Sequence, residues 1–138
     1  MQKMTVVVHS GDFDKIMSAL IIGNGFLAMG GEVTLFFTFW GLRGLMKGGL
    51  KRAPLSRMNW GGIGSWMMRR RMKQKKTASA ERLMEDFRQL GGRVVACEMT
   101  MEIMGLSKER MRQEWIDDYG TVGAWVQETL KADKTLFI

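Results

Sequence analysis

Cysteine is nearly absent from the sequence: Cys97 is the only one among 138 residues. One cysteine cannot form a disulfide within the chain, so a small secreted scaffold held together by disulfides is excluded. The N-terminus lacks a basic region followed by an apolar core, and no export signal is predicted. We therefore expect the protein in the reducing cytoplasm.

Proline and long apolar runs are also scarce. Pro54 is the only proline, which argues against long linkers and disorder. The longest uncharged run covers residues 16–31 and is interrupted by Asn24 and four glycines. A membrane span needs about 20 mostly apolar residues. We expect one domain, residues 1–138, without a transmembrane helix.

Acidic residues are missing from one third of the chain. Between Val33 and Ala80 there are 11 Lys or Arg and no Asp or Glu, whereas the other residues include 10 basic and 14 acidic ones. The net charge of +7 therefore comes from one segment. Positive charge spread over the whole chain would indicate a generic nucleic-acid binder. Positive charge confined to one segment does not.

The basic segment is also rich in tryptophan and methionine. Residues 47–76 hold Trp60 and Trp66, and we call them the basic excursion. This composition favours a surface that docks an acidic protein partner or takes part in subunit assembly. Peripheral contact with a membrane is the next interpretation. A nucleic-acid site ranks last, because no nucleic-acid-binding motif is present. Four cations are the predicted docking residues: Arg69, Arg70, Arg71 and Lys73.

Apolar patterning in the remaining chain alternates between strand and helix periods. Strands are predicted at 4–8, 32–38, 93–96 and 134–138, and helices at 13–29, 42–46, 79–90, 100–104, 107–115 and 121–132. This order predicts a small three-layer α/β fold, with a mostly parallel sheet of four or five strands flanked by helices. The basic excursion follows the second strand.

Functional sites in such sheets lie outside the carboxyl ends of the strands. His9, the turn 38–42 and Cys97 each follow a predicted strand, so we expect them to converge. Thr100 is the predicted N-cap of the next helix, and a helix N-terminus favours a thiolate. Free cysteine is also commonly inert packing, and that alternative stays open.

The neighbours of Cys97 allow several chemistries. Glu98 is expected to face away from the sulfur and to favour the helix dipole. His9 is a candidate base, although a histidine at a strand end is commonly structural. Cys97, His9, Met99 and Met101 are ligands that suit Cu(I). The 14 methionines are spread along the chain, however, and we predict neither a metal nor another cofactor.

Three motifs carry a resemblance to a known family. They are His-Ser-Gly-Asp at 9–12, Phe-Thr-Phe-Trp-Gly-Leu at 37–42, and Ala-Cys-Glu-Met-Thr-Met at 96–101 with Met-Gly at 104–105. Together they resemble the DsrE/DsrF-like superfamily, and more narrowly its longer DsrE-type branch of peroxiredoxin-like and sulfurtransferase proteins. The resemblance implies an α/β fold with a parallel sheet and assembly into homo-oligomers. It also implies a persulfide cysteine that exchanges sulfur with TusA-like or rhodanese-like proteins.

On this resemblance, Cys97 takes the place of the sulfur-carrying cysteine. Transfer between two proteins needs only one thiol on each. The leading hypothesis is a sulfur carrier or sulfurtransferase. The alternatives are a non-catalytic interaction or membrane-surface protein with a structural Cys97, or a thiol peroxidase or reductase, which normally needs a second cysteine. Residues of the motifs are expected to form the binding site around Cys97: Gly11, Thr38, Trp40, Gly41, Met99 and Thr100.

Overall fold

The computed structural model describes residues 1–138. Five strands form one sheet, in the order β4-β3-β2-β1-β5, and every neighbouring pair is parallel. The strands are β1 (Lys3–Val8), β2 (Glu32–Phe37), β3 (Arg93–Cys97), β4 (Asp118–Gly120) and β5 (Lys134–Phe137). The helices are α1 (Phe13–Ala28), α2 (Gly49–Arg52), α3 (Ile63–Gln74), α4 (Ala80–Gln89), α5 (Glu98–Met104) and α6 (Val122–Leu130).

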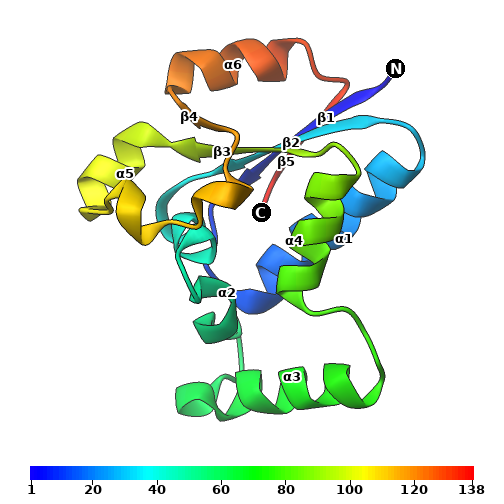
Figure 1. Cartoon of the computed structure of the whole chain (residues 1–138), viewed down its shortest axis with the longest axis vertical. Coiled ribbons are helices and arrows are strands. Elements are labelled where there is room, and N and C mark those ends of the chain that lie inside the picture. Colours follow the sequence, from blue (N-terminus) through cyan, green and yellow to red (C-terminus); the bar gives the residue numbers. More distant parts are fainter.

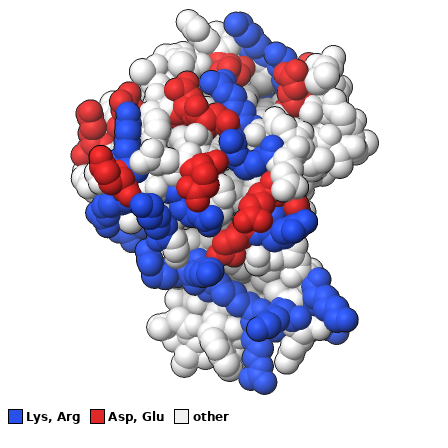
Figure 2. Space-filling view, viewed as in Figure 1, with Lys and Arg blue, Asp and Glu red and all other residues white.

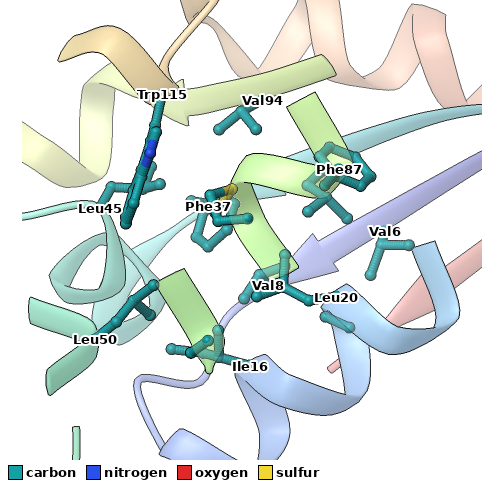
Figure 3. Close-up of a cluster of buried hydrophobic side chains, with 14 of the residues drawn as sticks. Val6, Val8, Ile16, Leu20, Phe37, Leu45, Leu50, Phe87, Val94 and Trp115 are labelled. Atoms are coloured by element: carbon teal, nitrogen blue, oxygen red, sulfur yellow. The ribbon is translucent and has the colours of Figure 1, made fainter. Parts of the chain in front are cut away.

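Three of the helices cover the two faces of the sheet. Helices α1 and α4 cover one face, and α6 lies over the other (Figure 1). Alternate strand residues such as Val6, Val8 and Phe37 point into the main core, where they pack with Phe87 and Trp115 (Figure 3). The predicted three-layer α/β fold with a parallel sheet is confirmed.

Two predicted helix starts are confirmed by their caps. The Ser79 hydroxyl accepts a hydrogen bond from the Arg82 N–H at 3.2 Å at the start of α4. The Thr121 hydroxyl accepts one from the Ala124 N–H at 3.2 Å at the start of α6. Both bonds satisfy amide groups that have no partner within the helix.

The predicted N-cap at Thr100 is wrong. Helix α5 begins at Glu98, and Cys97 itself occupies the N-cap position. Strand β3 runs into the helix without a connecting loop, so Thr100 falls inside the first turn and is buried. Cys97 is therefore both the last residue of β3 and the residue that starts α5.

The predicted helix at 107–115 is also wrong. The segment forms two 3₁₀ turns, Lys108–Arg110 and Gln113–Trp115, with extended backbone between them. Met111 pairs with Met46 in an antiparallel bridge, and the Arg112 N–H donates to the Leu45 carbonyl at 2.7 Å. This tertiary pairing outweighs the local helix preference.

One strand, β4, was not predicted from the sequence. Strand β4 is short and polar, and it pairs with β3 so that Cys97 lies opposite Gly120. The preceding Asp117 accepts a hydrogen bond from the Val94 N–H at 2.7 Å and pairs with Arg88. The short helix expected at 42–46 begins earlier, as a 3₁₀ helix over Phe39–Leu45.

The basic excursion divides in two: Leu50 and Ala53 of its first part are buried in the main core, and its second part folds as an arm. Helix α3 lies below the α1/α4 layer, far from the sheet (Figure 1). In Figure 2 the lower part of the molecule shows Lys and Arg beside uncharged residues, while Asp and Glu gather on the upper body. None of the helices combines the length and the apolar character needed to cross a bilayer.

Candidate functional site

The ends of four strands place a row of residues on one face of the sheet. Cys97 pairs with Gly120, and the neighbouring pair Phe37–Ala96 places Thr38 beside Cys97 on the other side. The Thr38 N–H donates to the Val8 carbonyl at 3.1 Å, which places His9 next in the row. His9 and Cys97 are two strands apart, about 10 Å at the usual strand spacing. The two residues share an edge, but His9 cannot hydrogen-bond directly to Cys97.

Cys97 is buried in a small cluster on the side of the sheet that α6 covers. It is 2 % exposed and packs with Phe36 and Val95 on the face opposite the main core. Trp125 of α6 packs against this cluster and stacks on Phe36, with ring centroids 4.7 Å apart and planes 12° apart. The Cys97 side chain makes no capping hydrogen bond. Its sulfur is thus uncommitted but shielded from solvent.

Two threonines fix the backbone around the cysteine. The Thr38 hydroxyl donates to the Thr100 hydroxyl at 3.4 Å, and that hydroxyl donates to the Cys97 carbonyl at 3.3 Å. Both are residues of the predicted binding site, and the structure brings them together beside Cys97. Their hydrogen bonds join β2 to the junction of β3 and α5.

Gly11, Trp40 and Gly41 form an interlocked pair of turns. The Gly41 N–H donates to the His9 carbonyl at 2.9 Å. A Cβ atom on Gly41 would lie 2.1 Å from the Val8 carbonyl oxygen, and one on Gly11 would lie 2.6 Å from that of Trp40. The close approach of these backbones requires both glycines.

The His9 ring lies between two aromatic rings. Its centroid is 5.5 Å from that of Phe39 and 5.5 Å from that of Phe137. Phe39 has a positive φ of 46°, which is an unusual backbone conformation for a residue with a bulky side chain. Such conformations occur more often at functional sites than elsewhere. Phe137 is 71 % exposed, so this group of tilted aromatic rings is open to solvent.

The soft ligands near Cys97 do not converge. Met99 is 52 % exposed, and Met101 is buried in the main core, on the other side of the sheet from Cys97. No group of three or more His, Cys, Asp or Glu side chains is placed to hold a metal ion. Glu98 is exposed in the first turn of α5, where a negative charge favours the helix dipole.

Arg69 differs from the other predicted docking residues. Its guanidinium donates to the carbonyls of Leu50 and Ala53 at 2.8 and 2.9 Å and lies 4.2 Å from the ring centroid of Phe13. Burial lowers the pKa of this guanidinium below its usual value. The side chain fastens α3 to the body, so it is committed within the fold.

The remaining docking candidates lie on the outer part of α3. Arg71 and Lys73 are exposed, and Arg70 lies 5.4 Å from the ring centroid of Trp66. An open groove of about 650 Å³ runs along this surface. Exposed apolar side chains accompany these cations: Met58, Trp60, Ile63, Trp66, Met67 and Met68.

Sequence comparison assigns the family. A profile of the DsrE/DsrF/DrsH-like family matches residues 1–53 and 44–137, so the chain belongs to this family. It is 33 % identical to the uncharacterized protein YrkE of Bacillus subtilis, over 99 % of this chain and 97 % of YrkE. It is 28 % identical to the sulfur carrier protein DsrE2 of Allochromatium vinosum, over 99 % of this chain and 98 % of DsrE2. The resemblance seen in the three motifs is confirmed, and it supports a sulfur-relay role at the level of the family.

Solved structures share the fold. The ychN protein from E. coli superposes with a TM-score of 0.64 at 18 % identity, with 100 % of both chains covered. MTH1491 from Methanobacterium thermoautotrophicum, a protein of unknown function, gives 0.60 at 12 % identity, with 99 % of both chains covered.

Three aromatic residues of the site were missed by sequence reasoning. Phe36 reads as an ordinary buried strand residue, and Trp125 as one of several apolar positions of a helix. Their stacking depends on how α6 crosses the sheet. Phe137 belongs to the predicted last strand, but its contact with His9 required the knowledge that this strand pairs with β1.

Proposed function

We propose that the protein is a persulfide sulfur carrier or sulfurtransferase that uses Cys97. The position of Cys97 carries this proposal: the only cysteine lies at the carboxyl end of β3, the edge where α/β sheets hold their sites. The family relationship to a protein named as a sulfur carrier supports it.

The transfer needs no other cysteine on this chain. The Cys97 thiolate attacks a sulfane sulfur of a donor such as a polysulfide, a new S–S bond forms, and the donor leaves as a shorter thiolate. An acceptor thiolate then attacks the outer sulfur, breaks that bond and leaves Cys97 as a thiolate. Sulfur is passed on in both steps without a net change in oxidation state.

The partners follow from the same chemistry. Donor and acceptor would be proteins of TusA-like or rhodanese-like type, and Arg70, Arg71 and Lys73 would dock an acidic surface. Exposed apolar residues of α1, among them Ile21 and Ile22, favour a homo-oligomer. A cytoplasmic protein with this arm could also contact a membrane surface.

Burial of Cys97 sets a requirement on the mechanism. A thiol that is 2 % exposed cannot meet a protein donor without movement of its cover. Helix α6 has no fully buried residue, and its main anchor on the sheet is the Trp125–Phe36 stack. We infer that α6 moves when the partner docks.

The same burial supports a second candidate. Cys97 would then be a packing residue, as many buried cysteines are. The protein would act through its exposed surfaces, as a non-catalytic interaction protein.

Sulfur loading separates the two candidates. The reduced protein is incubated with polysulfide or thiosulfate, desalted, and its intact mass is measured. The carrier predicts the added mass of one or more sulfur atoms, removed by reductant and absent from Cys97→Ala. Wild-type protein that stays unmodified both with these small donors and with a persulfidated rhodanese-like protein, while its denatured form reacts, would contradict the carrier and favour the packing role.

A further inference from the structure

Three arginines from separate segments line one hollow near the end of β1. Arg43 comes from the 3₁₀ helix Phe39–Leu45, Arg52 ends α2, and Arg110 lies in the turn after α5. The hollow has a volume of about 330 Å³ and its lining includes no Asp or Glu. We call it the arginine hollow. Cys97 does not line it.

The three cations have no ionic partners in the protein. None of them takes part in any of the salt bridges of the structure. The lining therefore carries three positively charged residues and no negatively charged one, which favours the binding of an anion. Four other arginines do form ion pairs: Arg82, Arg88, Arg93 and Arg112.

The arrangement is held by contacts outside the hollow. The Arg43 guanidinium lies 4.8 Å from the ring centroid of Trp40. Arg52 donates to the Lys47 carbonyl at 3.3 Å, and the Lys47 N–H donates to the Arg110 carbonyl at 3.1 Å. Lys47 therefore ties the segments of Arg52 and Arg110 together, which reduces the conformational entropy lost when a ligand binds.

The walls of the hollow indicate the chemistry of the ligand. Guanidinium groups donate paired hydrogen bonds to phosphate-like oxyanions with matching geometry. Apolar side chains line another part of the hollow, among them Met46, Met104 and Leu106. The volume lies near the lower limit of typical small-molecule pockets.

We propose that the arginine hollow binds a small molecule carrying a doubly charged tetrahedral oxyanion, such as a phosphate or sulfur oxyanion. The guanidinium groups hold the charged group, and the apolar wall accommodates an organic remainder. The site is separate from Cys97, and it stands whether or not Cys97 carries sulfur.

Calorimetric titration at constant ionic strength tests the proposal. The probes are inorganic phosphate, sulfate, thiosulfate and glycerol 3-phosphate, with chloride as the reference. We expect saturable one-to-one binding of at least one of the four divalent probes. Arg52→Gln and Arg110→Gln should each weaken it about tenfold, the loss expected for charge-assisted hydrogen bonds. Two variants are used in case one of them does not fold, and circular dichroism measures the secondary structure of both.

Matched variants separate the site from general charge effects. Arg57→Gln removes the same charge outside the hollow and should change the binding constant less than about twofold, as expected for a screened surface charge. Cys97→Ser should bind the anion as the wild type does, so this result is independent of sulfur loading. Tighter binding of glycerol 3-phosphate than of phosphate would show that the hollow prefers an anion with an organic remainder. Equal binding of the two would show that it recognises the free anion.

Three outcomes would overturn the proposal. The first is the absence of saturable binding of all four probes beyond the chloride reference. The second is an equal loss in Arg57→Gln and Arg52→Gln, which would show a general charge effect. The third is binding of polyanions such as heparin alone, which would assign the cations to a macromolecular surface.

Discussion

At the scale of single residues, the two turns at the sheet edge touch so closely that no Cβ atom fits between them. Gly11 and Gly41 are residues of the predicted binding site, and their contact with a ligand stays a prediction. The structure supplies a packing reason for both: each faces a carbonyl oxygen of the other turn or strand. The sequence motif shows that both positions are glycine. It does not show which atom would clash with a Cβ, because that carbonyl oxygen belongs to a segment about 30 residues away.

This close approach predicts opposite effects of one substitution at two glycines. Gly41→Ala should destabilise the protein by about 1–3 kcal/mol or more, because its Cβ would meet backbone that cannot move aside. Gly25 lies in α1 with nothing within 4 Å of an added Cβ, and Gly25→Ala should stabilise by about 0.5–1 kcal/mol. Urea unfolding measures both changes. Equal effects of the two alanines would refute the packing argument.

At the scale of elements, long segments with strong apolar periods were predicted well and short connections were not. Helices α1 and α4 and strands β1 to β3 carry patterns that tertiary contacts reinforce. Strand β4 has three residues, too few for a pattern, and it exists because β3 offers a free edge. The segment 107–115 has helical spacing, but its pairing with residues 45–47 decides its conformation.

We infer that helix α6 controls access to Cys97, because its Trp125 packs against the cluster that contains the cysteine. Trp125→Ala should increase the rate of Cys97 alkylation in the native protein by about tenfold, because losing the stack and its buried area removes roughly 1.5 kcal/mol from the closed state. Val126→Ala changes the exposed side of the same helix and should leave the rate unchanged. A mass-spectrometric time course with a maleimide reagent measures both.

If both variants are alkylated as slowly as the wild type, α6 is not the cover of the cysteine. If both react equally fast, the helix as a whole is loosened and Trp125 has no special part. Either result would contradict the role that we infer for the Trp125–Phe36 stack.

At the scale of the whole molecule, charge is divided between a mixed body and a basic arm (Figure 2). The sequence predicted this division, because a run without acidic residues is visible in one dimension. The arginine hollow was not predictable, since its three cations lie 9 and 58 residues apart in sequence and meet only through the contacts around Lys47. The hydrogen bonds of Arg69 to the carbonyls of Leu50 and Ala53 were not predictable either, because they join segments that are separate in sequence.

The charge division predicts salt-sensitive docking of relay partners. With purified TusA-like and rhodanese-like proteins as probes, Arg70→Gln/Arg71→Gln should slow association several-fold at low salt and little at high salt. Lys131→Gln/Lys134→Gln removes the same charge from the opposite end of the molecule and should have a smaller effect. Surface plasmon resonance gives the rates. Equal effects of the two pairs, or binding to anionic vesicles in place of both proteins, would contradict the docking role.

The interior position of β1 in the sheet, between β2 and β5, bears on how the chain is made. Strand β1 precedes the other four strands in the chain, yet one of its two neighbours is β5, and the Thr5 and Thr135 hydroxyls that meet across this pair are 130 residues apart in sequence. Contacts of such long range slow folding. The nascent chain therefore carries an open edge on β1 until β5 has been made. A molecular chaperone that covers this edge until β5 appears would raise the yield of folded protein.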